Sequence, residues 1–214
     1  MPDFSHENQH PAPVVGLDEA GCGPWAGPVV AGCAWIHQDM FPQDLKTVIN
    51  DSKKLSALKR SQIFESLIQL PENIFCYGVG QASVDEIDTL NIRQASYLAM
   101  QRAFASVQKV NPQFALVDGN SRPHLGIPLR SIIKGDQLSL SIAAASILAK
   151  VTRDRIMEQL HETHPEYGWH KNAGYGTKAH IEALEKHGIT PHHRKSYAPI
   201  AKLLAEVTQL STRH

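Results

Sequence analysis

The stretch GLDEAGCGPWAGPVVAG, residues 16–32, places two adjacent acids, Asp18 and Glu19, ahead of a cluster of glycines and prolines. The residues at 14–18 and 29–36 are rich in Val and Ile, which predicts a β-strand on either side of that cluster. The connection is too short for a crossover helix, so we expect the strands to pair antiparallel. Because like charges repel at the end of a buried strand, the pattern indicates either a solvated turn or a site for a cation.

Strands and helices alternate through the rest of the chain. A capping box at 83–86, Ser-Val-Asp-Glu, predicts that helical structure begins there. The predicted strands are 75–81, 114–118 and 129–133, and the predicted helices are 56–70, 92–107, 139–160, 178–186 and 200–207. The helix at 139–160 begins apolar nearly all round and Ala-rich, so we expect it to be buried close against a sheet. This order of elements predicts an α/β fold with helices on both faces of the sheet.

Length and composition are those of a soluble globular protein. The chain has 214 residues, 42% hydrophobic and 20% charged, which suits one domain. Its three cysteines form no CxxC pair and no apolar run approaches the roughly 18 residues of a membrane span, so we expect a cytoplasmic protein without a membrane segment. Residues 1–13 are polar and Pro-rich, which predicts a short disordered tail rather than a signal peptide.

Charge gives no general attraction for nucleic acid. The 21 basic and 21 acidic residues leave a formal net charge of zero. Binding to nucleic acid would therefore depend on local basic clusters, at 53–60, 150–155 and 192–195. Each cluster taken alone is more typical of a solvated helix face.

Acidic residues follow three of the predicted strands. Asp18 and Glu19 end the first strand, Asp118 ends the strand at 114–118, and Asp136 follows the next one. Loops at strand ends converge on one crevice in open α/β sheets, so three such sites predict a shared pocket, although a single Asp-Gly is normally only a turn. A pair of Mg²⁺ or Mn²⁺ ions would offset the repulsion among four carboxylates. Two ions about 3.5–4 Å apart can cleave a phosphodiester, one activating water and the other stabilising the leaving 3′ oxygen.

Three other motifs are weaker. Residues 21–26 match the dinucleotide-binding pattern GxGxxA, but a predicted strand follows where that motif requires a helix. Residues 161–164, HETH, fall one residue short of the zinc motif HExxH and have no cysteine pair nearby. Residues 136–142, DQLSLSI, resemble a sliding-clamp-binding peptide but enter the predicted buried helix.

Taken together, the sequence resembles the bacterial ribonuclease HII family from about residue 14 to residue 199. Seven stretches in the same order carry the resemblance: DEAGCGPWAGPVVAG, DSKKLS, LVDGN, KGD, SIAAASILAKVTRD, GYGTKAH and HHRKSY. It implies a mixed five-stranded ribonuclease H-like sheet with flanking helices as a catalytic core at 14–160. It also implies a C-terminal helical segment at 161–214 that packs on the same domain. We expect a monomer.

The resemblance also implies an activity and its residues. The family hydrolyses the RNA strand of RNA–DNA hybrids and nicks duplex DNA on the 5′ side of an embedded ribonucleotide. Tyr175 matches a tyrosine that stacks near the ribose at the RNA-to-DNA junction, although a tyrosine between glycines also fits an ordinary loop. Lys53 matches a lysine near substrate phosphate. The residues implied to bind two Mg²⁺ or Mn²⁺ ions and to be catalytic are Asp18, Glu19, Asp118 and Asp136.

One position departs from the family. The family usually has Gly-Arg-Gly after the paired acids, where this chain has Gly21, Cys22 and Gly23. If main-chain groups of this turn recognise the ribose 2′-OH, Cys22 preserves the contact. If the arginine side chain binds phosphate, that contact is lost. We therefore expect retained activity with weaker substrate binding.

Two other classes of function stay open at this stage. A non-catalytic nucleic-acid-binding module would need basic or stacking residues but no carboxylate cluster, so the four acids argue against it. A DNA-cutting nuclease or resolvase on a similar scaffold would share the acids and differ in substrate.

Overall fold

A five-stranded mixed sheet forms the centre of the protein, and the computed structural model describes residues 1–49 and 55–211 of it. The strand order is β3-β2-β1-β4-β5. β1 pairs antiparallel with β2 as expected, β2 pairs antiparallel with β3, and β4 and β5 run parallel to β1. The strands are β1 (Val14–Ala20), β2 (Val29–Ile36), β3 (Phe75–Ala82), β4 (Phe114–Asp118) and β5 (Leu129–Ile132). The predicted mixed sheet is confirmed.

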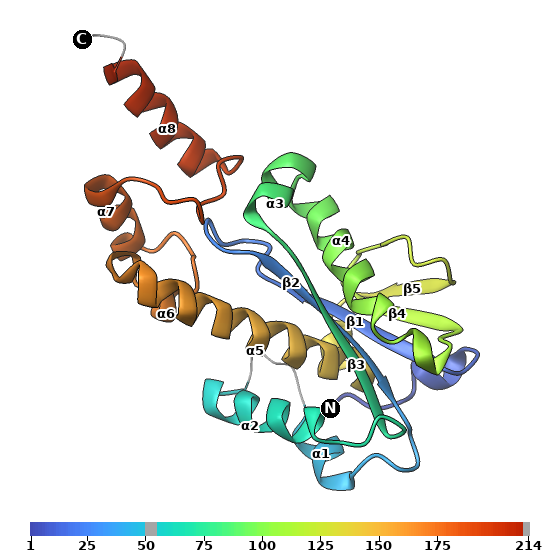
Figure 1. The fold of residues 1–214 in the computed structure, drawn as a ribbon. Coiled ribbons are helices and arrows are strands. Elements are labelled where there is room, and N and C mark those ends of the chain that lie inside the picture. The colour runs from blue at the N-terminus through green and yellow to red at the C-terminus, as the bar shows by residue number, and fades with distance from the viewer. Residues whose placement is uncertain (50–54, 212–214) are drawn as a thin grey trace.

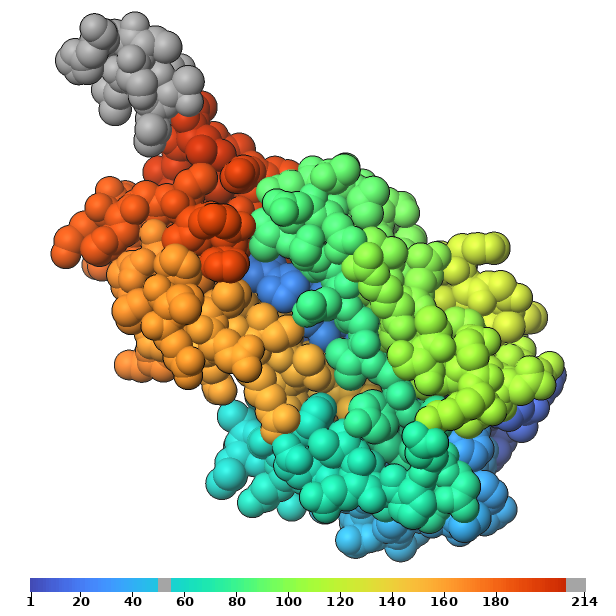
Figure 2. Space-filling view, viewed as in Figure 1, coloured from blue at the N-terminus to red at the C-terminus, as the bar shows by residue number. Residues whose placement is uncertain are grey.

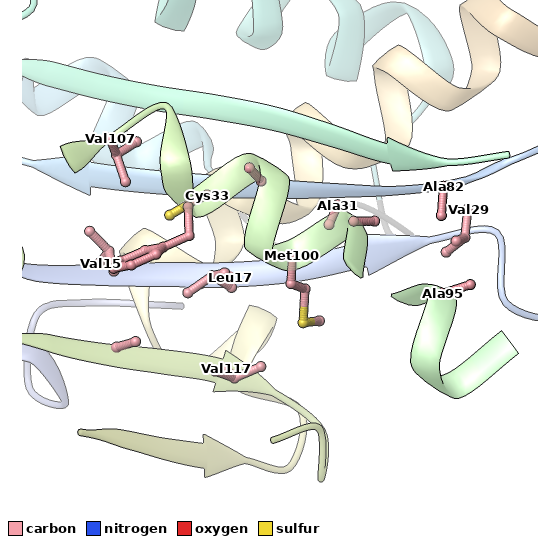
Figure 3. Packing of buried hydrophobic residues seen from close by; sticks show 14 of the residues in the cluster. Val15, Leu17, Val29, Ala31, Cys33, Ala82, Ala95, Met100, Val107 and Val117 are labelled. Carbon is pink, nitrogen blue, oxygen red and sulfur yellow. The ribbon is translucent and has the colours of Figure 1, made fainter. Parts of the chain in front are cut away.

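Helices cover both faces of the sheet (Figure 1). α4 (Ile92–Ala105) packs on one face, where Met100 and Ala95 lie among strand side chains such as Leu17 (Figure 3). α5 (Leu140–Thr163) packs on the other face beside α2 (Ala57–Ile68). Other elements before α5 include α1 (Gln43–Val48), α3 (Val84–Leu90) and the 3-10 turns η2 (Gln108–Val110) and η3 (Gly135–Gln137). In Figure 2, blue atoms of the first hairpin lie at the bottom of a hollow between green α3 and orange α5–α6.

The predicted capping box is present at the start of α3. The Ser83 amide donates to Glu86 Oε2 at 2.9 Å, and the Glu86 amide donates to Ser83 Oγ at 3.2 Å. Asn91, with φ of 67°, separates α3 from α4 and caps the latter by accepting from the Arg93 and Gln94 amides. The predicted helical start at 83–86 and the separate predicted helix at 92–107 are thereby confirmed.

Small residues let α5 and α4 approach the sheet closely. A Cβ at Gly16 would lie 2.2 Å from the Ser141 carbonyl carbon, and one at Gly32 would lie 2.2 Å from the Ala145 carbonyl oxygen. On the other face, a Cβ at Gly80 would lie 2.3 Å from the Ala99 carbonyl oxygen. The strands therefore need glycine at these crossings, and the burial of the Ala-rich helix is confirmed.

Gly32→Ala tests this close packing. The added methyl would meet the main chain of α5, so we expect overpacking to lower the free energy of unfolding by about 3 kcal/mol. Thermal denaturation followed by circular dichroism measures the change. Gly126→Ala is the control: a Cβ there meets no heavy atom within 4 Å, and only its positive φ of 75° is strained, which costs about 1–2 kcal/mol. A Gly32→Ala protein as stable as the wild type would contradict the close approach.

The N-terminal residues differ from the disordered tail that we expected. They form the 3-10 turn η1 (Glu7–Gln9), and the Glu7 side chain is only 3% exposed. Its Oε1 accepts from Ser139 Oγ at 2.6 Å, from Ser141 Oγ at 2.7 Å and from the Ser141 amide at 3.0 Å. A carboxylate at the N-terminus of α5 offsets the unpaired amides there. Composition could not show this because the partners lie more than 130 residues away in sequence.

The C-terminal part is helical, as predicted. Tyr167, Trp169, Leu184 and Ile200 form its own apolar cluster with Met157 of α5. Its elements are η4 (Pro165–Tyr167), α6 (Trp169–Asn172), α7 (Lys178–His187) and α8 (Ala198–Ser211). α5 continues through the boundary expected at residue 160, and α8 extends away from the sheet (Figure 1). Within the described residues, we find no helix of sufficient length and apolarity for a membrane span.

Candidate active site

The first two predicted acidic sites lie side by side at one end of the sheet. The parallel register of β1 and β4 pairs Leu17 with Val117, so the next residues, Asp18 and Asp118, lie at the same level. Asp18 is 5% exposed, and its Oδ1 accepts from the Glu19 amide at 2.7 Å. The sheet therefore brings together two acids that are 100 positions apart in the chain.

The turn after β5 carries the third of the predicted acidic positions, Asp136. Asp118 Oδ1 accepts from the Gly135 amide at 2.6 Å and from the Asp136 amide at 3.4 Å. A Cβ at Gly135 would lie 2.6 Å from Ile142 Cδ1 and 3.3 Å from Asp118 Oδ1, so this approach requires glycine. Asp136 itself is buried. The Asp136 amide thus lies at the Asp118 carboxylate, so the turn after β5 reaches the same end of the sheet.

The surroundings of Asp18 are electrostatically unfavourable for negative charge. Burial raises the pKa of Asp18 well above its ordinary value, and the charges of Glu19 and then Asp118 raise it further. Hydrogen bonds from Ser146 and from the Glu19 amide lower that pKa only in part. In the described part of the chain, no ion pair joins Asp18 or Asp118 to a Lys or Arg. A bound cation would supply the missing positive charge.

The donor atoms suit a hard divalent cation. Among residues 1–49 and 55–211, no three His, Cys, Asp or Glu side chains are grouped closely enough to hold an ion by themselves. Mg²⁺ does not require such a cage, because it keeps several waters and takes one or two carboxylates together with substrate phosphates. The pair Asp18 and Asp118, with carboxylate oxygens only, fits that mode of binding.

Two buried arginines, Arg153 and Arg194, donate hydrogen bonds to main-chain carbonyls of the turn between β1 and β2. Arg194 is fully buried, and its guanidinium donates to the carbonyl oxygens of Gly21 at 2.6 Å and Gly27 at 2.9 Å. It also donates to the Cys22 and Pro28 carbonyls and to the Tyr197 hydroxyl. Arg153, 2% exposed, donates to the carbonyls of Ala26, Pro28 and Ala173. Strand β2 follows this turn, which excludes the dinucleotide-binding interpretation.

The prediction for two of the basic clusters is wrong at Arg153 and Arg194. We expected the clusters at 150–155 and 192–195 to be solvated faces or contacts to nucleic acid. Arg153 and Arg194 instead point inward, since six main-chain carbonyls accept from them there and a guanidinium supplies several donors at fixed angles. The sequence carried no local signal for this, because their partners lie in a different part of the chain.

Cys22 points toward α4. Its Sγ lies 3.7 Å from Glu19 Oε1, and its side chain joins the apolar cluster beneath α4. Burial, followed by the Glu19 charge, raises the pKa of the thiol to about 12. The Cys22 carbonyl accepts from Arg194 and Tyr197, so the main chain of the turn is fixed independently of this side chain.

Cys22→Arg tests the phosphate contact that the resemblance implies for an arginine at this position. Because the main-chain contacts do not involve the side chain, we expect kcat to stay within about twofold and KM for a substrate duplex to fall about threefold to tenfold through a new phosphate contact. Steady-state kinetics at fixed salt measures both. Cys22→Gln, long but uncharged, is the matched control and is expected to leave KM unchanged. An unchanged or higher KM for Cys22→Arg would contradict the account.

Tyr175 lies beside the glycine turn. Its side chain is 52% exposed, and a Cβ at Gly23 would lie 3.3 Å from Tyr175 Cε1. The ring therefore covers Gly23 while leaving one part open to solvent. The other predicted substrate residue, Lys53, lies outside the described residues. The structure thus places Tyr175 against Gly23 and Cys22 beside Glu19.

Comparisons with known proteins agree with this architecture. A family model described as ribonuclease HII matches residues 15–200. Ribonuclease HII of Gluconobacter oxydans is 48% identical over 204 residues, covering 95% of this chain and 97% of that protein. Ribonuclease HII of Magnetococcus marinus is 52% identical over 193 residues, covering 89% and 87%.

Solved structures show the same fold. The crystal structure of ribonuclease H2 from Pyrococcus horikoshii superposes with a TM-score of 0.74 at 29% identity, covering 89% of this chain and 96% of that one. A crystal structure of Bst-RNase HIII in complex with Mn²⁺ superposes with a TM-score of 0.71 at 17% identity, covering 92% and 70%. The second likeness concerns the fold alone.

Proposed function

The chain belongs to the ribonuclease HII family, metal-dependent endonucleases that degrade the RNA strand of RNA–DNA hybrids, and we propose that it also nicks duplex DNA 5′ of a single embedded ribonucleotide with two divalent ions. The observation that carries the proposal is the meeting of Asp18, Asp118 and the Asp136 main chain at one end of the sheet, next to the Gly21–Gly23 turn.

The carboxylates have the first role in this mechanism. Asp18, Glu19, Asp118 and Asp136 hold the divalent ions, for which Mg²⁺ or Mn²⁺ suits the oxygen donors. When bound, such ions supply an activated water and stabilise the leaving 3′ oxygen, so that the products carry a 5′ phosphate and a 3′ hydroxyl. The Gly135 amide fixes one oxygen of Asp118, and the other oxygen would serve as a ligand.

The glycine turn has the second role, which is recognition of RNA. Gly21 has a φ of 99° and Gly23 has no side chain, so the main chain of this turn can approach a sugar closely. We propose that its main-chain groups contact the ribose 2′-OH, the group that distinguishes RNA from DNA. Tyr175 then stacks on the neighbouring sugar at the junction, and Lys53 contacts a substrate phosphate.

A labelled duplex with one ribonucleotide tests the proposal. The expected result is a single nick 5′ of the ribonucleotide with Mg²⁺ or Mn²⁺, none with chelator, and none in an all-DNA duplex. Cleavage of the all-DNA duplex would favour the DNA-cutting nuclease. Cleavage of a long hybrid without any nick at the single ribonucleotide would contradict the finer claim.

Tyr175→Ala tests the stacking role. Loss of one aromatic–sugar or aromatic–base stack weakens binding by about 1–3 kcal/mol, so we expect kcat/KM on the single-ribonucleotide duplex to fall about tenfold or more. A long hybrid should lose less, because it offers many positions for cleavage. Tyr175→Phe keeps the ring and should stay near the wild type. Equal losses on both substrates would contradict junction recognition by this residue.

A further inference from the structure

We propose that His180 and His193 are positioning residues that hold Tyr175 against Gly23 and thereby set the preference for single ribonucleotides over long hybrids. The proposal rests on the proposed function of Tyr175 and assigns to two buried histidines a part in specificity. Neither touches the surface where substrate would lie, because both side chains are fully buried.

A chain of hydrogen bonds joins the two rings to Tyr175. The Thr190 amide donates to His193 Nδ1 at 2.9 Å, so the proton of a neutral His193 lies on Nε2. His193 Nε2 lies 3.1 Å from His180 Nε2, which must then accept. The proton of His180 is therefore on Nδ1, which donates to the Tyr175 carbonyl oxygen at 2.9 Å. These contacts assign one tautomer to each ring.

The surroundings keep both rings neutral. Burial lowers the pKa of His180, and burial, followed by repulsion from His180 if that ring were protonated, lowers the pKa of His193 to about 3. Trp169 Nε1 donates to His180 Nε2 at 3.3 Å, and the Tyr167 and Trp169 rings pack against the pair. The direction of the hydrogen-bond chain is thus fixed at neutral pH.

The same segment also holds the glycine turn. His193 forms an antiparallel bridge with Ala26, where the Gly27 amide donates to the His192 carbonyl at 2.9 Å and the Arg194 amide donates to the Trp25 carbonyl at 2.8 Å. The Trp25 amide in turn donates to the Gly174 carbonyl at 2.8 Å. The residues before and after His193 therefore fix the turn, while its ring fixes Tyr175 through His180.

This arrangement links the position of the Tyr175 ring to that of the Gly21–Gly23 turn, and both must contact the same nucleotide. A single ribonucleotide offers one 2′-OH, so only one register lets the Gly21–Gly23 turn contact it while Tyr175 stacks beside it. A long hybrid offers a 2′-OH at each step and tolerates a displaced ring. Loss of the hydrogen bond from His180 to the Tyr175 carbonyl should thus reduce cleavage at single ribonucleotides more than cleavage of hybrids.

Two substitutions at His180 separate this role from simple packing. His180→Leu removes the donor to the Tyr175 carbonyl. His180→Asn can place its amide nitrogen near the position of Nδ1 and keep that donor while losing Nε2. We expect His180→Leu to lower the ratio of kcat/KM on the single-ribonucleotide duplex to that on a long hybrid about tenfold, the effect of one buried hydrogen bond, and His180→Asn to restore most of it.

A combination with Tyr175→Ala tests whether His180 acts through Tyr175. In the Tyr175→Ala background, His180→Leu should change the ratio no further. If His180→Leu does not fold, His180→Gln, which keeps a polar group near Nε2 but no donor at Nδ1, takes its place with the same expected loss. A folded variant without the Nδ1 donor and with an unchanged ratio, or with fully additive losses, would overturn the proposal.

Hydrogen exchange tests the positioning role of His180 separately from the proposed function of Tyr175. The Thr177 amide donates to the same Tyr175 carbonyl at 2.8 Å, so its exchange should accelerate in His180→Leu but not in His180→Asn. Unchanged exchange overturns the positioning role whatever the enzyme cuts. Faster exchange in a protein that does not nick single ribonucleotides would instead reject the proposed function of Tyr175.

Discussion

Asp118→Asn is expected to lower kcat at least about a thousandfold while the fold and the affinity for substrate persist. Asp118 lies level with Asp18 at the end of the sheet, and a neutral amide there is a much poorer ligand for Mg²⁺ or Mn²⁺. The amide oxygen can still accept from the Gly135 amide, so the local main chain should not move. Single-turnover cleavage of a hybrid and of a single-ribonucleotide duplex measures the loss.

Without metal, the same variant should lose no stability, in contrast to its loss of activity. The charge of Asp118 contributes to raising the pKa of Asp18, which shows that the two carboxylates repel in the absence of an ion. Removing one charge should leave the melting temperature in chelator equal to or above that of the wild type. Asp39→Asn, at an exposed position, is the control for the same chemical change. Near-normal cleavage by Asp118→Asn with either metal would overturn the assignment of the site.

Arg194→Met is expected to lower the free energy of unfolding by about 4–5 kcal/mol, because it leaves several buried carbonyls without a donor. The guanidinium donates to Gly21, Cys22, Gly27 and Pro28, and methionine fills a similar volume without replacing any of these bonds. For a chain of this length the melting temperature should fall by about 10–15 °C. Thermal and urea denaturation measure the change.

The same substitution should also affect activity well below its melting temperature. The Gly21 and Cys22 carbonyls lose their anchor, so we expect a higher KM on the single-ribonucleotide duplex. Arg155→Met is the matched control: Arg155 is exposed and pairs with Glu65, and such a surface pair contributes at most about 1 kcal/mol. An Arg194→Met protein as stable as Arg155→Met would show that the turn does not depend on the buried guanidinium.

Local patterns in the sequence predicted the elements that depend on neighbours in the chain. The strand at 29–36 has the predicted bounds, and the capping box starts α3 as expected, because both follow from residues only a few positions apart. The short helix α1 escaped prediction, since six residues give too little periodicity to read. The strand-end acids were predictable because the carboxyl ends of parallel strands share one edge of a sheet.

Contacts between distant parts of the chain were not predictable from these patterns. Arg194 serves carbonyls more than 160 positions away, and Glu7 caps a helix that begins at Leu140. In sequence, both residues are indistinguishable from ordinary surface charges, because only the tertiary fold brings their partners to them. The hydrogen bonds of His180 and His193 were missed for the same reason, although the stretches that contain them, GYGTKAH and HHRKSY, were themselves part of the resemblance.

The binding of divalent ions by acids from separate strands is tested most directly by crystals soaked in Mn²⁺, with diffraction recorded at a wavelength where manganese scatters anomalously. The account predicts an anomalous peak within about 2.0–2.4 Å of carboxylate oxygens of both Asp18 and Asp118. A peak bound to only one of these residues, or no peak at this end of the sheet, would contradict it.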